Sequence, residues 1–371
     1  MAIPVFDFVV VGEGGGPDEC NLSSYLFKPT SHEWSKGCLA LEAGSGQGAL
    51  QKSIDRDPSL FNGETQSAAE IFSFVRAYLV THAHLDHVQS LVISAGSLSG
   101  PRKRVYAAEN TLKDLETIFA DRIWPQLASY DIEDEEHKLL YSPIGTTDTY
   151  EQLIPDVSAR YFPVSHGHND RGDYDSSAFF IRHDPTNQEF LFFGDVEPDS
   201  LSNAPKTIHV WRAAAAKIPT TLRTIFIECS WPSSRSDDTL YGHLSPRHFV
   251  QELETLAAGT LIFIRSTLPI AILPAAEVVR VRNAAATAAS SPPASPVRPA
   301  RKRQRLAPLA PDLRGALAGI RIFVIHCKDT LDGASGRPNQ ALIIDEINAL
   351  LGPKELGVEI FPARQGMRIQ I

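Results

Sequence analysis

The sequence predicts an α/β protein in which strands and helices form layers around a buried core. Short apolar runs recur along the chain, and most of them end in turn-forming or ligand-type residues. Segments with helical periodicity lie between these runs, and strands that alternate with helices indicate a layered α/β architecture. A chain of 371 residues, 43% of them hydrophobic, can also bury a substantial core.

The predicted strands and helices follow one another along the chain. In order, the strand-like runs are FDFVVVG, CLALEAGSG, FVRAYLV, ARYFPVSHGH, FLFFGDVEPD, TIFIECSW and IRIFVIHCKD. A helix is predicted over 110–119, because Leu112, Leu115, Ile118 and Phe119 would share one face. A second helix is predicted over 245–258.

Composition narrows the classes of protein to consider. The net charge of −9 argues against a generic nucleic-acid binder, whose surface would be basic. The four cysteines show no CxxC spacing, which indicates reduced thiols in an intracellular protein: Cys20, Cys38, Cys229 and Cys327. The N-terminus resembles a first strand more than a signal peptide, and no apolar run approaches the roughly 20 residues of a membrane-spanning helix. We therefore expect a soluble, cytoplasmic protein.

The stretch THAHLDH directly follows the predicted strand 74–80. If the chain leaves the sheet in extended form, His82 and His84 lie on one side, with Asp86 again on that side. His87 would open a short helix that Asp86 is placed to cap. Four ligand-type side chains would then converge at the carboxyl end of a strand, which predicts a metal site.

Three later strand-like runs end in a polar residue of the same kind, namely His166, Asp195 and His326. Open α/β sheets gather their sites at the carboxyl ends of strands. Imidazole and carboxylate ligands without thiolates suit zinc, manganese or iron. Seven ligands suit two ions about 3.5–4 Å apart that share a bridging carboxylate. The other strand-end and loop histidines are interpreted as structural: His32, His137, His168, His183, His209 and His248.

The pattern HxHxDH followed by His, Asp and His resembles the metallo-β-lactamase superfamily. Longer strings resemble the class II cyclic-nucleotide phosphodiesterases: THAHLDHVQSLVISA, VYAAENTLKDLETIFADRIWPQL, FFGDVEPDS, YGHLSP and GGGPDECNLSSYL. This resemblance covers nearly the whole chain except 283–311. One departure is LEAG, where the superfamily usually has Asp at the position of Glu42, and GTLIFIRSTLPIAILPAAEVVRV also matches the family poorly.

The resemblance implies an αβ/βα sandwich of two mixed sheets, with helices outside and metals at one edge. It implies two divalent ions, with zinc expected and manganese or iron as alternatives. The implied substrate is a 3′,5′-cyclic nucleotide, with cAMP expected, although the preference over cGMP stays open. Carried over position by position, His82, His84 and His166 would hold one ion, and Asp86, His87 and His326 the other, with Asp195 bridging.

The implied reaction is hydrolysis to the 5′-monophosphate by a metal-bound hydroxide. Two ions can neutralise the phosphodiester and lower the pKa of a bound water towards 7. Asp86 and His243 are the candidate catalytic residues, and His243 would contact the phosphate or protonate the leaving oxygen. Alternatively, His243 caps the helix that starts near Ser245. Glu197 and Asp199 could orient the ligating imidazoles.

A segment rich in proline, alanine and basic residues interrupts the predicted single domain at 283–311. It has six prolines, five basic residues and no acidic residue, which predicts disorder. Its basic stretch PARKRQR (299–305) resembles a nuclear-import patch, so nuclear entry is one interpretation and a solvated linker is the other.

Two rival functions stay open at this point. One is a tRNA 3′-processing nuclease of the same superfamily that uses the basic insertion as an RNA arm; the other is a non-enzymatic nucleotide sensor. The acidic balance of the chain counts against the nuclease, and the intact ligand set counts against the sensor. We expect a small-molecule substrate and neither a membrane nor a nucleic-acid partner. The oligomeric state stays open, with a homodimer as one option.

Overall fold

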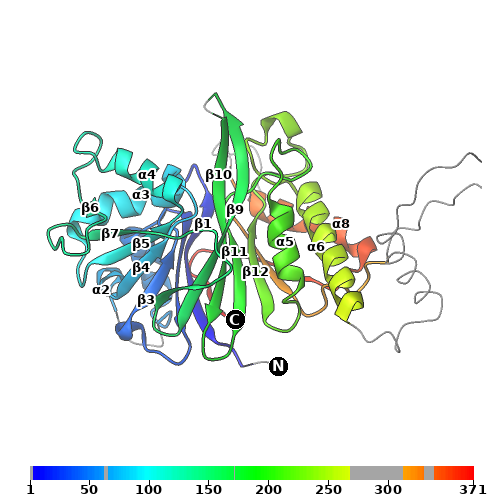
Figure 1. Cartoon of the computed structure of the whole chain (residues 1–371), viewed down its shortest axis with the longest axis horizontal. Coiled ribbons are helices and arrows are strands. Elements are labelled where there is room, and N and C mark those ends of the chain that lie inside the picture. The colour runs from blue at the N-terminus through cyan, green and yellow to red at the C-terminus, as the bar shows by residue number, and fades with distance from the viewer. Residues whose placement is uncertain (1–2, 62–65, 171, 268–311, 330–337) are drawn as a thin grey trace, which may run out of the picture.

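The computed structural model describes residues 3–61, 66–170, 172–267, 312–329 and 338–371. Two β-sheets lie face to face, and helices cover their outer faces (Figure 1). Each sheet contains both parallel and antiparallel strand pairs. The predicted αβ/βα sandwich of two mixed sheets is therefore confirmed.

The first sheet has eight strands in the order β15-β1-β2-β3-β4-β5-β7-β6. In chain order these strands are β1 (Phe6–Gly15), β2 (Leu22–Pro29), β3 (Cys38–Leu41), β4 (Val75–Leu79), β5 (Lys103–Ala107), β6 (Ala128–Ser129), β7 (Leu139–Pro143) and β15 (Arg368–Gln370). The helices α1 (Gln47–Arg56), α2 (Ala68–Ser73), α3 (Leu85–Ser94) and α4 (Glu109–Ile118) belong to this half of the chain. Figure 1 shows α3 and α4 on its outer side.

The second sheet has seven strands in the order β14-β13-β12-β11-β10-β9-β8. These strands are β8 (Glu151–Ile154), β9 (Val157–Asn169), β10 (Gly172–His183), β11 (Gln188–Phe193), β12 (Leu222–Glu228), β13 (Arg321–Ile325) and β14 (Glu359–Pro362). Its outer side is covered by α5 (Thr207–Ala215), α6 (Pro246–Thr267) and α8 (Asn339–Leu351) (Figure 1). Short 3₁₀ turns occur at Trp34–Lys36, Ala95–Ser97, Asp237–Thr239 and Gly352–Lys354.

Aromatic rings fill the space between the two sheets. Phe8 of the first sheet stacks on Phe226 of the second with ring centroids 4.7 Å apart, and Phe226 stacks in turn on Phe323 at 5.0 Å. A second apolar cluster lies between the first sheet and its helices, and a third lies between the second sheet and its helices. Because closely packed interiors resist displacement, this core holds the strand ends at fixed positions relative to one another.

Some predicted element boundaries were wrong. Helix α3 begins at Leu85 and not at His87, and His84 occupies its N-cap position. Asp86 therefore lies within the first turn and does not cap the helix, because the extended backbone ends at His84. Helix α6 continues to Thr267, beyond the predicted end at 258. The predicted helix over 110–119 is confirmed as α4, with Leu112 and Leu115 buried.

The predicted insertion, 283–311, lies outside the described residues, so its disorder and the single-domain interpretation stay predictions. Beyond it, β13 pairs in parallel with β12 on one side and with β14 on the other. Within the described ranges, no helix combines the length and apolar character needed to cross a membrane.

Candidate metal centre

Seven side chains from distant parts of the chain meet at one end of the sandwich. His82 and His84 follow β4, and Asp86 and His87 lie in the first turn of α3. The other three members are His166 near the end of β9, Asp195 after β11 and His326 after β13. The structure thus places all seven predicted ligands in two adjoining groups around Asp195.

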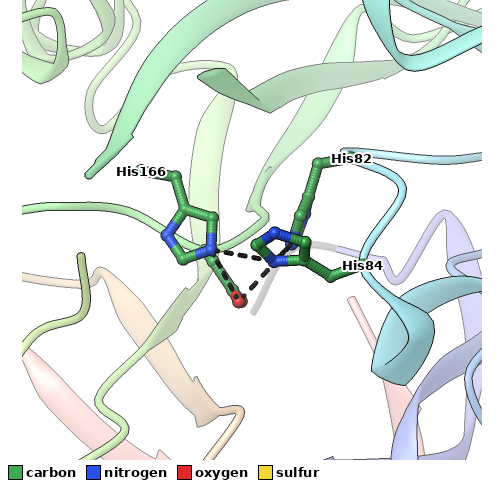
Figure 2. Close-up of side chains that lie close together, drawn as sticks. His82, His84 and His166 are labelled. Atoms are coloured by element: carbon green, nitrogen blue, oxygen red, sulfur yellow. Dashed lines mark hydrogen bonds and ion pairs between the residues drawn. The ribbon is translucent and has the colours of Figure 1, made fainter. Parts of the chain in front are cut away.

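The first group contains three histidines whose rings turn toward one another (Figure 2). Nδ1 of His84 lies 3.1 Å from Nε2 of His82 and 3.2 Å from Nε2 of His166. Oδ2 of Asp195 lies 3.6 Å from Nε2 of His82 and 3.5 Å from Nε2 of His166. Three ring nitrogens and one carboxylate oxygen therefore surround a single point.

The second group is built around the other oxygen of the same aspartate. Oδ1 of Asp195 lies 3.3 Å from Nε2 of His87 and 3.3 Å from Nε2 of His326. These two ring nitrogens are 3.0 Å apart, and Oδ2 of Asp86 lies 3.2 Å from Nε2 of His326. The two oxygens of Asp195 therefore face different groups, which is the arrangement of a bridging carboxylate.

Neighbouring groups orient the imidazoles through their remaining ring nitrogens. Nδ1 of His82 lies 3.0 Å from Oγ1 of Thr81, and Nδ1 of His166 lies 2.9 Å from the carbonyl oxygen of Gly242. Nδ1 of His326 lies 3.0 Å from Oγ of Ser230. The ring of Tyr174 stacks on His84 at 4.7 Å. Engaging one nitrogen of an imidazole fixes its tautomer and directs the other nitrogen at the metal position.

The carboxylate of Glu42 faces the remaining ring nitrogen of His87 as an ion-pair partner, at a distance too long for a hydrogen bond. The buried Oε2 of Glu42 lies 3.6 Å from Nδ1 of His87 and accepts a hydrogen bond from the backbone N–H of Thr81 at 3.4 Å. The backbone of Glu42 has φ 59°, in the left-handed region that only a few non-glycine residues adopt. The side chain that replaces the usual aspartate thus reaches a ligand-type histidine.

The charge states of His82, His166 and Asp195 suit a cation. Burial lowers the pKa of His166 to about 3 and also lowers the pKa of His82, so both rings are neutral near pH 7. Burial alone would raise the pKa of Asp195, but His326 and His87 outweigh it and keep the carboxylate ionised. Neutral imidazoles and ionised carboxylates are the forms that bind metals. Oδ1 of Asp195 also has no hydrogen-bond partner among the described residues, although it is buried.

His243 lies next to both groups. Its Nδ1 is 2.9 Å from Oε1 of Glu228, and its ring centroid lies 4.9 Å from that of His166. The side chain does not cap α6; instead Ser245 at the start of that helix bonds Nδ1 of His248. His243 is buried and lines a pocket that opens beside the metal centre.

Sequence reasoning missed Glu228 and Ser230. Glu228 ends β12, and besides His243 it accepts hydrogen bonds from the backbone N–H of Val196 at 3.0 Å and from Ser230 Oγ at 2.6 Å. Burial, with the nearby charge of Asp195, raises the pKa of Glu228 to about 7. The sequence did contain a signal for Glu228, because this residue ends the apolar run TIFIE, and Asp195 and His326 likewise stand at the ends of apolar runs.

The predicted role of Asp199 was wrong. Its carboxylate accepts hydrogen bonds from the backbone N–H groups of Lys206, Thr207 and Ile208 at 3.0, 3.0 and 2.8 Å, so it caps α5. Glu197 lines the pocket, but its side chain contacts no imidazole in the described hydrogen bonds and ion pairs. The orienting partners come instead from Thr81, Ser230, Glu42 and Glu228.

The pocket beside the centre has a volume of about 510 Å³. His84, His166 and His243 form part of its lining, as do Tyr174, Leu201 and Tyr241. Tyr241 is 70% exposed and Leu201 39% exposed, so both present apolar surface at the pocket rim. A pocket with convergent polar groups and an apolar rim suits a small ligand with a polar end and an apolar end.

An αβ/βα sandwich with paired His and Asp groups at its strand ends defines the metallo-β-lactamase fold class. A solved metallo-β-lactamase fold protein from Bacillus subtilis matches with a TM-score of 0.53 at 11% identity, covering 98% of this chain and 99% of that one. A crystal structure of unliganded yeast PDE1 matches with a TM-score of 0.76 at 22% identity, covering all of both chains.

The chain belongs to the class II cAMP phosphodiesterase family, whose model matches residues 50–280. A 3′,5′-cyclic-nucleotide phosphodiesterase of Schizosaccharomyces pombe is 31% identical over 267 residues, which cover 67% of this chain and 74% of the relative. A probable 3′,5′-cyclic-nucleotide phosphodiesterase of Yersinia pestis is 26% identical over 264 residues, covering 69% and 74%. The family resemblance in the sequence is therefore confirmed.

Proposed function

We propose that this protein hydrolyses 3′,5′-cyclic nucleotides, cAMP foremost, to nucleoside 5′-monophosphates. The observation that carries the proposal is the position of Asp195 between two histidine-containing groups beside a pocket of nucleotide size. Membership of the class II cAMP phosphodiesterase family supports the same reaction. The relatives named above as cyclic-nucleotide phosphodiesterases support it over a tRNA-processing nuclease.

Two divalent ions, zinc first, fit the donor set of the centre. His82, His84 and His166 would hold one and Asp86, His87 and His326 the other, with Asp195 shared between them. When bound, the ions would neutralise the phosphate charge and lower the pKa of a bound water towards 7. The chain's own contribution is to present neutral imidazoles in fixed tautomers, since their second nitrogens are already engaged.

His243 and Glu228 form a route for the proton that the leaving 3′-oxygen requires. With Nδ1 of His243 held 2.9 Å from Glu228, its Nε2 is left to face a substrate in the pocket. If Glu228 carries a proton, it can pass that proton to Nδ1 while Nε2–H protonates the leaving oxygen. Because the pKa of Glu228 is raised to about 7, a large part of this carboxyl group is protonated at neutral pH, and the protonated form predominates below it. General acid catalysis of this kind contributes roughly 10²–10⁴-fold.

Tyr241 and Leu201 provide apolar surface for the base of the nucleotide. Both lie on the same pocket as His243, and the ring of Tyr241 is largely exposed despite its size. The residue has φ 54° and is followed by Gly242, whose carbonyl orients His166. A base stacked on Tyr241 would therefore lie beside the metal centre.

Metal analysis combined with turnover assays on cAMP, cGMP and a tRNA precursor tests this function. We expect about two divalent ions per chain, turnover of a cyclic nucleotide, and loss of turnover on chelation that added zinc restores. Less than one tightly bound ion, together with activity that chelators do not change, would contradict the two-metal centre. Turnover of the tRNA precursor alone would replace the proposed substrate.

The cellular location and the oligomeric state are two further points of the proposal. We propose a cytoplasmic protein; for the basic stretch 299–305 the alternatives to be tested are nuclear entry and a solvated linker, and for the oligomeric state a homodimer is one option. Fluorescence imaging of tagged protein with and without that stretch tests the first point. Analytical ultracentrifugation of the holoprotein tests the second.

A further inference from the structure

A second pocket lies at the opposite end of the first sheet from the metal centre. Its lining includes Lys36, Arg76, Arg102 and Arg104, together with His32. Lys36 precedes β3, Arg76 is the second residue of β4, and Arg102 and Arg104 lie at the start of β5. Arg76 and His82 are six residues apart along β4 and its extension, which corresponds to on the order of 20 Å.

The four cations have no carboxylate to neutralise them. None of the residues that line the pocket is acidic, and no described carboxylate forms an ion pair with Lys36, Arg76, Arg102 or Arg104. The ring of His32 on the lining contacts the carboxylate of Asp156 at 3.1 Å. In a protein of net charge −9, an uncompensated cluster of four positive charges is an anion-binding feature.

Two of the arginines are held in place by neutral groups. Nη1 of Arg102 donates to the backbone carbonyls of Asp131 and Ile132 at 2.8 and 3.4 Å, and Nη2 donates to the backbone carbonyl of Leu139 and to Ser129 Oγ at 3.1 and 3.0 Å. The terminal N–H groups of Arg102 are therefore engaged, and this residue adds positive charge to the pocket but no free donor pair; its buried Nε has no partner among the described residues. Arg104 donates to Ser142 Oγ at 3.3 Å. These contacts fix the positions of the charges and leave the charges themselves unpaired. A preorganised guanidinium loses little conformational freedom when it binds an oxyanion.

The opposite wall of the pocket is apolar and comes from the second sheet. Leu153 and Ile154 of β8 form it together with Pro155, and Pro101 contributes from the first half of the chain. The volume of about 650 Å³ lies within the range of small-molecule sites, which is roughly 300–1,000 Å³. The pocket therefore offers charge on one side and a hydrophobic surface on the other.

We propose that this pocket binds a nucleoside triphosphate, with its phosphates on Lys36, Arg76 and Arg104 and its base against Leu153 and Ile154. The triphosphate carries enough negative charge to engage these three cations, with the charge of Arg102 adding to the positive field, and guanidinium groups suit phosphate oxygens in bidentate geometry. The apolar wall distinguishes a nucleotide from inorganic polyphosphate, which would use the charges alone. This site is separate from the metal centre and does not depend on the proposed hydrolysis.

Calorimetric titration of the zinc-loaded protein with ATP, tripolyphosphate and adenosine tests the proposal. We expect ATP to bind more tightly than either part alone. Arg76→Gln and Lys36→Gln should each weaken ATP binding by about tenfold or more, since each removes a charge-assisted contact. Lys36 is exposed, so its replacement leaves the fold intact even if Arg76→Gln does not.

Two variants serve as controls. Arg122→Gln changes an exposed arginine outside the pocket, and His243→Ala changes the catalytic pocket; neither should alter ATP affinity. ATP binding that survives Lys36→Gln and Arg76→Gln, or that is lost in His243→Ala instead, would overturn the proposal. If tripolyphosphate binds as tightly as ATP, the apolar wall contributes nothing to binding and the choice of a nucleotide as the ligand is overturned. Absence of ATP binding to the unaltered protein would overturn the site altogether.

Discussion

The carboxylate of Glu42 lies 3.6 Å from Nδ1 of His87, and both side chains are buried. This pair links the first sheet to the second ligand group, because Glu42 follows β3 and His87 lies in α3. We expect Glu42→Ala to weaken metal binding by about 10–100-fold, the usual effect of removing a partner that orients a ligand. Competition with a chromogenic chelator measures this affinity. The matched control is Glu33→Ala at an exposed site, and equal affinity in both variants would exclude an orienting role.

The Glu42–His87 pair also predicts that the protein releases a proton when it binds metal. Burial lowers the pKa of His87, but the carboxylates of Asp195, Glu42 and Asp86 outweigh it and raise the pKa well above its usual value. The metal-free ring is therefore protonated at neutral pH, and a metal at Nε2 must displace that proton. Affinity should rise as pH rises toward the raised pKa. Calorimetry in buffers of different ionisation enthalpy measures the released protons, and Glu42→Gln should reduce their number; an unchanged number would contradict this assignment.

Asp195 and Asp199 provide a matched pair that separates metal binding from fold stability. Asp195→Asn should abolish turnover and lower the metal content, because the substitution replaces one oxygen of the carboxylate whose two oxygens face the two groups. Asp199→Asn should keep both metals and turnover. It should weaken the cap of α5, which costs about 0.5–2 kcal/mol of unfolding free energy at most. Metal analysis and denaturant unfolding distinguish these outcomes. Normal metal content in Asp195→Asn would refute the shared-ligand role.

His243→Ala should cut kcat by roughly 10²–10⁴-fold without loss of metal, because it removes the proposed general acid. A substrate with a good phenolate leaving group needs little protonation, so it should be spared much of this loss. Glu228→Gln should give a smaller defect of the same kind, since the amide holds Nδ1 of His243 but cannot relay a proton. Equal losses on both substrates would assign His243 to binding or to structure.

Tyr241→Ala should raise KM for cyclic nucleotides by about 5–100-fold, because stacking on an aromatic ring contributes about 1–3 kcal/mol per base. A substrate without a base, such as a bis-aryl phosphodiester, should be affected little. Tyr130→Ala, at another exposed tyrosine far along the chain from the pocket residues, is the control. If KM rises similarly for both substrates, Tyr241 acts by positioning the metal centre through Gly242 and His166, and not by stacking on the base.

The α/β class and the seven ligand-type residues that the structure gathers could be predicted from the sequence. These are local signals: an apolar run defines a strand, and a His or Asp at its end marks the sheet edge where such residues meet. The family strings then indicated how the strands assemble. The predicted start of α3 and the predicted role of Asp199 were wrong, because each depended on where one backbone turn begins.

The side chains that support that centre, and those that form the basic pocket, could be identified only once the fold was known. Glu42, Glu228 and Ser230 orient histidines that lie between 13 and 96 residues away in the chain, and in these cases no spacing rule connects donor and acceptor. The basic pocket likewise joins Lys36 and Arg76 with Leu153 of the other sheet. Such contacts depend on how two sheets pack, which is a property of the whole core and is not encoded in any single segment.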